Sequence, residues 1–299
     1  MRVFDRRAVR AHRDRAAAGF AQHTFLLDEV AARLVERLDD VKREFRCVLD
    51  LGAHVGTLRD KIETRPGLDF VVASDLSPAM TKKLGGAAVV ADEEALPFAD
   101  GSFDLIVSGL SLHWVNDLPG ALVQIRRALC PDGLFVAALL GGDTLVELRQ
   151  ALVEAESEVE GGASPRISPF LDVREGGALL QRAGFALPVV DSDSITVTWP
   201  NALALMRDLR GMGETNAVAE RKKGFARRET LLAAASRYQE RHADSAGRIP
   251  ATFQVITLTG WAPHDSQQQA LRPGAAEARL ADALDAEESP AGDKADPKA

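Results

Sequence analysis

The sequence predicts an α/β fold, a doubly wound and mostly parallel sheet with helices on both faces. In the first half of the chain, five short apolar segments alternate with segments whose apolar residues have helical spacing. An acid ends or follows each of the first three apolar segments, and glycines follow the first. Strands that alternate with helices pair in parallel, because the chain crosses back over the sheet through each helix. We therefore expect a ligand to bind at the carboxyl ends of these strands.

The expected strands are short apolar runs, because strands of a parallel sheet are covered on both faces. The expected helices have apolar residues three and four positions apart. In chain order, we expect strands at 46–51, 70–74, 88–91, 105–108, 134–140, 195–198 and 252–259, and helices at 20–38, 57–65, 78–84, 118–129, 144–159, 177–182, 202–209 and 229–241.

The chain divides into four expected regions. Residues 1–45 form an N-terminal helical arm and 46–163 the α/β core. Residues 164–263 hold the remaining strands and a helical cap, since the strict alternation stops after the glycine pair at 161–162. Residues 264–299 are rich in Ala, Glu, Asp and Pro and have too little apolar content to order themselves.

Composition and charge exclude several classes of function. The 299 residues carry a formal net charge of -8 and the pI is about 5.4, which argues against nucleic-acid binding. No segment is apolar over the length of a membrane span, and the arginine-rich start lacks the apolar stretch of a secretory signal. Cys47 and Cys130 lack metal-ligand spacing, which favours a reducing compartment. We expect a cytoplasmic protein, or a mitochondrial-matrix protein if the source is eukaryotic.

The first candidate binding element is the loop 50–56, which reads Asp-Leu-Gly-Ala-His-Val-Gly and joins a strand to a helix. Gly52 and Gly56 let the backbone turn sharply and let a ligand approach the main chain. The amide groups at the start of the next helix are free to bind that ligand. A tight turn without a ligand explains the same glycines equally well.

Acids at the ends of the next two strands form the second element. Asp75 ends one strand, and Asp92, followed by Glu93, ends the other. A carboxylate has two acceptor oxygens, so Asp75 suits adjacent ribose hydroxyls, and Asp92 or Glu93 suits an adenine amino group. A helix N-cap for Asp75 and a solvated loop acid for Glu93 are the alternatives. Because these strand ends meet at one edge, we expect Asp50, Asp75 and Asp92 to converge on one adenosyl group.

Several motifs accompany these residues. They are Asp-Leu-Gly at 50–52, Ser-Asp-Leu-Ser-Pro-Ala-Met at 74–80, Ala-Asp-Glu-Glu-Ala-Leu-Pro-Phe at 91–98, Ser-Phe-Asp-Leu-Ile at 102–106 and Leu-Cys-Pro-Asp-Gly-Leu-Phe at 129–135. Together they resemble class I S-adenosylmethionine-dependent methyltransferases. The resemblance implies a Rossmann-like, seven-stranded sheet with an antiparallel last strand and a helical cap, and S-adenosyl-L-methionine as cofactor. The cofactor-binding residues that it implies are Asp50, Gly52, His54, Gly56, Asp75, Leu76, Asp92, Glu93 and Ser108.

Longer stretches in both halves of the chain resemble a narrower group. They are 111–119, 141–149, 167–170, 208–216 and 260–261. The resemblance is to the family of the complex I assembly factor that has a methyltransferase fold and hydroxylates an arginine of a quinone-site subunit. It implies an enzyme whose partner is that subunit of the respiratory NADH dehydrogenase. The biotin-pathway methyltransferase acting on malonyl-acyl-carrier protein is a more distant relative. A conventional methyltransferase and a non-catalytic assembly chaperone remain alternatives.

His54 departs from the family pattern, in which many members have glycine at this place. A side chain there crowds the position where the amino-acid end of the cofactor approaches the backbone. It could weaken or reorient the cofactor, supply a new hydrogen bond, or lie on the surface beside an unaltered cofactor.

Two residues are candidates for catalysis, His113 after the fourth strand and Asp143 after the fifth. His113 could act in the pocket or be structural. Asp143 could bind a guanidinium group, because carboxylate and guanidinium match bidentately, or it could be the N-cap of the helix 144–159. The motif 211–216 predicts either a hinge or a plain turn between helices.

Six arginines lie within the first sixteen residues, against two acids. A solvated helix face explains them most simply, with an acidic partner or a peripheral membrane contact as the alternative.

Overall fold

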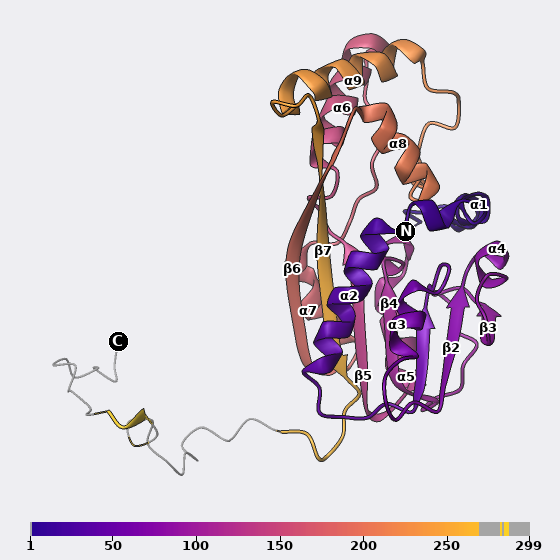
Figure 1. Cartoon of the computed structure of the whole chain (residues 1–299), viewed down its shortest axis with the longest axis vertical. Helices are drawn as coiled ribbons and strands as arrows, with labels where there is room; N and C mark the ends of the chain where they lie inside the picture. Colours follow the sequence, from indigo (N-terminus) through magenta and orange to yellow (C-terminus); the bar gives the residue numbers. More distant parts are fainter. Residues whose placement is uncertain (1, 269–281, 283, 287–299) are drawn as a thin grey trace. The chain divides into compact units, whose positions relative to one another are not determined.

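Seven strands form one mixed sheet in the order β3-β2-β1-β4-β5-β7-β6 (Figure 1). Strands β1 to β5 pair in parallel, and β7 is antiparallel to β5 and β6. The chain runs outward from β1 to β3 and then returns to β4 beside β1, which opens a crevice beyond the carboxyl ends of β1 and β4. The predicted fold class is confirmed. The strands are β1 Cys47–Leu51, β2 Phe70–Asp75, β3 Ala87–Val90, β4 Phe103–Gly109, β5 Leu129–Leu140, β6 Ala186–Trp199 and β7 Ile249–Trp261.

The computed structural model describes residues 2–268, 282 and 284–286. Met1–His264 form one compact unit, and Asp265–Ala299 form a second. The tail for which the sequence predicts disorder lies mostly outside the described residues.

Helices cover both faces of the sheet, because strand side chains alternate between two apolar cores. Val48, Leu105 and Val136 pack with α2 and α3 on one face. Leu49 and Ile106 pack with α5 and α7 on the other. The helices are α1 Arg6–Ala16, α2 Phe25–Asp39, α3 Thr57–Ile62, α4 Pro78–Thr81, α5 Leu118–Ala128, α6 Val146–Glu160, α7 Val173–Arg182, α8 Ala202–Gly211 and α9 Arg228–His242, with 3-10 turns η1 Phe20–Gln22 and η2 Leu112–Trp114.

β6 and β7 are much longer than the segments 195–198 and 252–259 that the sequence predicts. β6 has 14 residues and lies at an edge of the sheet. Its polar residues 191–194, in the middle of the strand, are exposed or half-exposed, and Leu187 and Val189 before them are exposed too, so the strand lacks the continuous apolar run of a buried strand.

The helical cap packs on the part of β6 and β7 that extends beyond β5 (Figure 1). Residues 255–261 of β7 pair with both β5 and β6, whereas 249–254 pair with β6 alone among the described strands. Tyr238 of α9 is buried and donates its hydroxyl to the carbonyl oxygen of Pro250, at 2.5 Å. The cap is therefore joined to the sheet through continuous strands.

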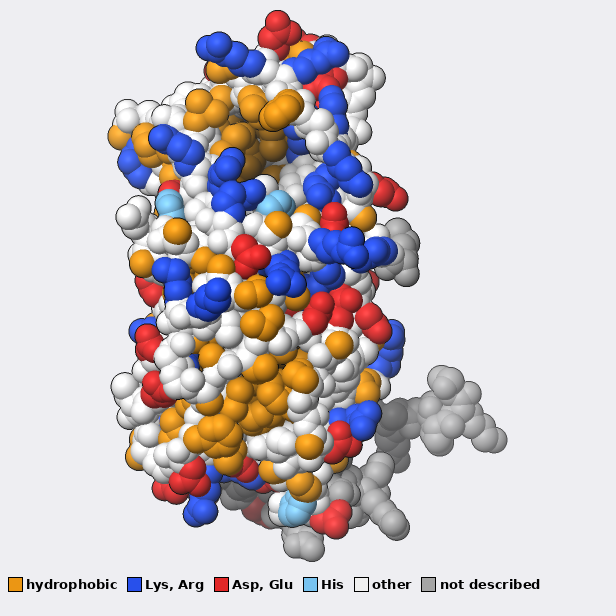
Figure 2. Space-filling view, turned by 90° about the vertical axis from the view of Figure 1, so that its right-hand side faces the viewer, with side chains coloured by type: hydrophobic (Ala, Val, Ile, Leu, Met, Phe, Trp, Pro, Cys, Tyr) orange, Lys and Arg blue, Asp and Glu red, His pale blue; other side chains and the backbone are white. Residues whose placement is uncertain are grey.

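The opposite edge of the sheet is β3. Its residues Ala87, Ala88 and Val90 are exposed. Figure 2 shows hydrophobic side chains gathered on this side of the molecule. No helix among the described residues is both long and apolar enough to span a bilayer.

The loop after β1 packs tightly against the segment after β4. Gly52 has a φ of +73°, and a Cβ built on it would lie 2.1 Å from Ser111 Oγ. Only glycine fits this position, because both the backbone angle and the contact exclude a side chain.

Replacing Gly52 with alanine should destabilise the protein more than replacing Gly101. Both glycines have a positive φ, which costs an L-residue about 1–2 kcal/mol. At Gly101 a Cβ meets open space, whereas at Gly52 it meets Ser111, which adds about 1–3 kcal/mol. Urea unfolding followed by circular dichroism measures both losses. Equal losses would show that the Gly52–Ser111 contact is not tight in solution.

Candidate functional site

Four buried polar side chains gather at the carboxyl ends of β1, β2 and β4 and in the loop after β3. They are Asp50, Asp75, Glu93 and Ser111, each at most 1% exposed. Asp92 lies beside them, but about a third of its side chain is exposed. The structure thus brings acids from three strand ends together, with Glu93 rather than Asp92 innermost.

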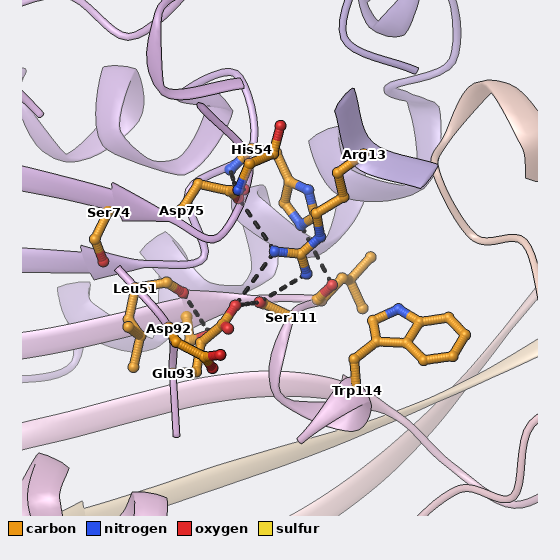
Figure 3. Close-up of polar contacts among 12 residues, drawn as sticks. Arg13, Leu51, His54, Ser74, Asp75, Asp92, Glu93, Ser111 and Trp114 are labelled. Atoms are coloured by element: carbon orange, nitrogen blue, oxygen red, sulfur yellow. Dashed lines mark hydrogen bonds and ion pairs between the residues drawn. The ribbon is translucent and has the colours of Figure 1, made fainter. Parts of the chain in front are cut away.

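Arg13 of α1 occupies the centre of this group (Figure 3). Its Nη1 lies 3.2 Å from both Asp75 Oδ2 and Glu93 Oε1, and its Nη2 donates to Ser111 Oγ at 2.9 Å. The Ser111 hydroxyl donates in turn to Glu93 Oε1. A single guanidinium therefore compensates two buried carboxylates that would otherwise repel each other.

Arg6 makes a second set of contacts on one side of this network. Its Nη2 donates to Asp92 Oδ1 at 2.6 Å and to Glu93 Oε2, and its Nη1 donates to the carbonyl oxygen of Trp114. Arg6 and Arg13 are two helical turns apart, so both point from one face of α1 into the crevice. The expectation of a solvated face is wrong for these two arginines, because the acids of the crevice compensate the cost of burying them.

The charge of Glu93 depends on these arginines. Burial raises the pKa of Glu93, but Arg13, Arg6 and the hydrogen bond from Ser111 outweigh it and bring the pKa down to about 2. Glu93 is therefore ionised at neutral pH and bound to two cations.

Asp50 has a different environment. Its Oδ2 accepts from the backbone amide of Arg59 at 3.1 Å, whereas its Oδ1 is buried without a hydrogen-bond partner. Burial raises the pKa of Asp50 to about 7, against the lowering effect of the Arg59 amide and with a further rise from Asp75. Asp50 thus has an unused oxygen inside the crevice.

His54 is buried rather than on the surface, with a φ of +52°. Its ring stacks on Phe20 with the centroids 5.5 Å apart, and its Nε2 lies 3.3 Å from the carbonyl oxygen of Leu110. Burial and the charge of Arg13 lower the pKa of His54, so the ring is neutral at pH 7. Because Nε2 faces a carbonyl, it carries the proton, and Nδ1 is left as a buried acceptor without a partner.

A cavity of about 630 Å³ adjoins the crevice and reaches under the cap. His54 and Leu110 line it at the end near the crevice, and leucines of α2 and α6 line its apolar wall. Among the described residues that line it, Glu214 is the single acid. The four Lys and Arg side chains that also line it are Arg166, Arg210, Arg221 and Lys222.

Glu214 is held by the residues after β4. His113 Nε2 lies 3.1 Å from Glu214 Oε2, and Trp114 Nε1 lies 3.1 Å from Oε2 and 3.3 Å from Oε1. Trp114 lines the cavity, whereas the side chain of His113 is fully buried and is not among the lining residues. Sequence reasoning identified His113 but missed Glu214. The break in the helical pattern at 211–216 was the one signal for it.

The other residues predicted to bind the cofactor or to act in catalysis have these positions in the structure. Gly56 has a φ of +96° before α3, and Leu76 packs with Trp114 in a small apolar cluster. Ser108 donates its hydroxyl to the carbonyl oxygen of Leu51 at 2.7 Å. Asp143 is exposed and lies outside the cavity lining. The N-cap alternative for Asp143 is wrong, because α6 begins at Val146 and no side chain caps it.

The described residues contain no group of three or more His, Cys, Asp or Glu side chains placed to hold a metal ion. Cys47 and Cys130 are free and partly exposed.

Replacing Arg13 with alanine should destabilise the fold by about 3–5 kcal/mol, because buried Asp75 then loses its cation and Glu93 keeps Arg6 alone. Arg10 of the same helix is a matched control, since its side chain is half exposed and its acid partner lies 3.8 Å away. R10A should change the free energy of unfolding by less than about 1 kcal/mol. If R13A unfolds at the same urea concentration as R10A, the buried network does not hold α1 in place.

The raised pKa of Asp50 predicts a pH dependence of stability. Between about pH 4 and 7 the folded protein keeps a proton that the unfolded chain has lost, so the contribution of Asp50 to stability falls as the pH rises and levels off above 7. Each pH unit in this window is worth at most about 1.4 kcal/mol. In D50N the fall should be absent, whereas the exposed-site control D40N should follow the wild type, because Asp40 is not among the charges that shift the pKa of Asp50. Parallel stability curves for D50N and wild type from pH 5 to 8 would contradict the prediction.

Comparison with known proteins agrees with this architecture. Residues 49–137 match the model of the methyltransferase domain family. Two solved structures share the fold. The YcgJ protein of Bacillus subtilis has a TM-score of 0.54 at 15% identity, covering 77% of this chain and 98% of its own. Phosphoethanolamine N-methyltransferase 2 of Haemonchus contortus has a TM-score of 0.54 at 15% identity, covering 86% of this chain and 60% of its own.

Sequence relatives match both the core and the cap. The mitochondrial arginine-hydroxylase NDUFAF5 of Danio rerio is 43% identical over 288 residues, which cover 94% of this chain and 89% of the relative. The human arginine-hydroxylase is 43% identical over 92% of this chain and 81% of its own length. The malonyl-[acyl-carrier protein] O-methyltransferase of Halorhodospira halophila is 36% identical over 89% of this chain and 91% of its own. The chain therefore belongs to the family of these arginine-hydroxylases, within the class I methyltransferase superfamily.

Proposed function

We propose that this protein binds S-adenosyl-L-methionine in the crevice and hydroxylates an arginine of a protein subunit. The observation that carries the proposal is 43% identity to an arginine-hydroxylase over 94% of the chain, since a match of this extent includes the cap as well as the core. The cofactor residues of the proposal are Asp50, Gly52, His54, Gly56, Asp75, Leu76, Asp92 and Glu93. When bound, the cofactor would supply an electrophilic methyl group on a sulfonium centre, which the oxygen insertion proposed here does not consume.

Two buried acceptor atoms that lack hydrogen-bond donors support the binding of the cofactor here. Asp50 Oδ1 and His54 Nδ1 are both buried, and neither has a hydrogen-bond partner. An adenosyl or amino-acid group in the crevice offers the donors that such acceptors lack. His54 then contributes a hydrogen bond to the site instead of only crowding it.

Asp75 sets a condition on cofactor binding. Its Oδ1 accepts from the Ser77 amide, and its Oδ2 is shared by the His54 amide and Arg13. Oδ2 already has two donors, so a ribose hydroxyl reaches it only if the guanidinium of Arg13 shifts, whereas Oδ1 has one acceptor position left. The proposal therefore includes a rearrangement of α1 when the cofactor binds.

The substrate of the proposal is the quinone-site subunit of the respiratory NADH dehydrogenase, in the cytoplasm of a bacterium or the matrix of a mitochondrion. Hydroxylation inserts an oxygen atom into a carbon–hydrogen bond. With dioxygen as the oxidant it also consumes a pair of electrons and releases water, so the reaction needs an electron donor besides the subunit. A peripheral contact with the membrane, through arginines of α1 that stay exposed, would bring the protein near this complex.

The test compares the quinone-site subunit purified from wild-type cells, from a strain that lacks this gene and from the complemented strain. Mass spectrometry should find one arginine heavier by an oxygen atom in the first and third samples and unmodified in the second. The proposal is wrong if that subunit has the same modifications in all three.

Conventional methyl transfer is a second candidate, favoured by the 36% identity to a malonyl-[acyl-carrier protein] O-methyltransferase over 89% of this chain. Cell extract incubated with methyl-labelled cofactor distinguishes the two. Label that this protein transfers to a small molecule or an acyl-carrier fraction supports the methyltransferase. An absence of cofactor binding in calorimetry would leave a non-catalytic assembly role.

A further inference from the structure

The cavity next to the crevice has a wall that is mostly apolar and one acid, Glu214. Three of its four basic residues are compensated by other carboxylates. Arg166 pairs with Glu156 at 2.6 Å, Arg221 with Asp5 at 3.3 Å, and Lys222 with Glu160. A cationic group that enters the cavity therefore has Glu214 as its one carboxylate partner in the lining.

The carboxylate of Glu214 is fixed in position. His113 and Trp114 both donate to Oε2, while Oε1 accepts a single longer bond from Trp114, at 3.3 Å. A carboxylate has about four acceptor positions on its two oxygens, and these three bonds leave about one, on Oε1, for an N–H of a guanidinium. Burial raises the pKa of Glu214, but His113, Arg13 and Trp114 outweigh it and lower the pKa, so the acid is ionised at neutral pH.

The rest of the lining also suits an arginine side chain. Trp114 and Phe170 provide aromatic surfaces near Glu214, and guanidinium groups stack on aromatic rings. His54 and Leu110, which belong to the loops after β1 and β4, line the same cavity. A group held on Glu214 therefore shares one cavity with the loop at the cofactor crevice.

We infer that Glu214, held by His113 and Trp114, binds the guanidinium of the substrate arginine and sets the specificity of the enzyme for it. The inference rests on the proposed arginine hydroxylation, and it names the substrate-binding residue of that same site. His113 is then a positioning residue, because it contacts Glu214 and not the cavity.

The test measures binding of two synthetic peptides to the full-length protein. Both have the sequence around the arginine identified by mass spectrometry in the quinone-site subunit. One peptide keeps that arginine, and in the other citrulline, a neutral isostere, replaces it. Wild-type protein should bind the arginine peptide more tightly. E214Q should bind it about 10- to 100-fold more weakly, because a charge-assisted bond is lost, and should bind the citrulline peptide as wild type does.

Controls separate recognition from folding. Glu220 is exposed in the same connection between α8 and α9, so E220Q should bind both peptides as wild type does. E214D keeps the charge but shortens the side chain, and should lose less affinity than E214Q. Cofactor affinity and thermal unfolding of all variants show whether the fold is retained.

The outcomes distinguish the inference from the proposed function. If the subunit arginine is hydroxylated in cells but folded E214Q still prefers arginine to citrulline as wild type does, the inference alone is overturned. If E214Q weakens both peptides equally, Glu214 is structural and the inference is also overturned. If no arginine of the subunit is modified in any strain, the proposed function fails, and the inference fails with it.

Discussion

One buried cation, Arg13, joins the first helix to the rest of the fold. Its guanidinium contacts Asp75 at the end of β2, Glu93 after β3 and Ser111 after β4. These three groups come from separate parts of the chain, and the two carboxylates could not be buried so close together without a positive charge between them. The cation also lowers the pKa of Glu214 in the neighbouring cavity. Arg13 thus contributes at once to the position of α1, to the ionisation of Glu93 and to the charge of the cavity wall.

The central part of the fold could be predicted from the sequence because parallel strands buried on both faces are apolar throughout. The segment 70–74 is such a run, and β2 occupies Phe70–Asp75. The helix expected at 118–129 forms α5, and the side chain of Asp117 caps it by accepting from the Gly120 amide. The full length of β6 could not be predicted, because this solvent-exposed edge strand has polar residues at 191–194 that resemble a loop and interrupt its apolar residues.

Part of the candidate site could also be predicted, because it follows from the order of the strands. Strand-end acids could be placed near one another from topology alone, and the structure brings Asp50, Asp75 and Glu93 into one buried group. Partners from distant segments could not be placed. Arg13 looks like a residue of a solvated helix, because nothing local shows that acids 62 and 80 residues later will surround it. Glu214 was hidden similarly, since only the folded cap brings it to His113, 101 residues away.

The extension of β6 and β7 beyond β5 limits how far the cap can move away from the cavity. The cap packs on strands that continue directly into the sheet. It therefore cannot rotate away as a rigid body without breaking the hydrogen bonds between β6 and β7. The connection 212–227 between α8 and α9 is restrained as well, because Val218 forms an antiparallel bridge with Phe4 and the Ala217 carbonyl oxygen accepts from the Asp5 amide. The paired strands and this bridge therefore keep the cavity wall stiff on both sides, and the fully exposed Phe225 borders the cavity in the later part of the connection.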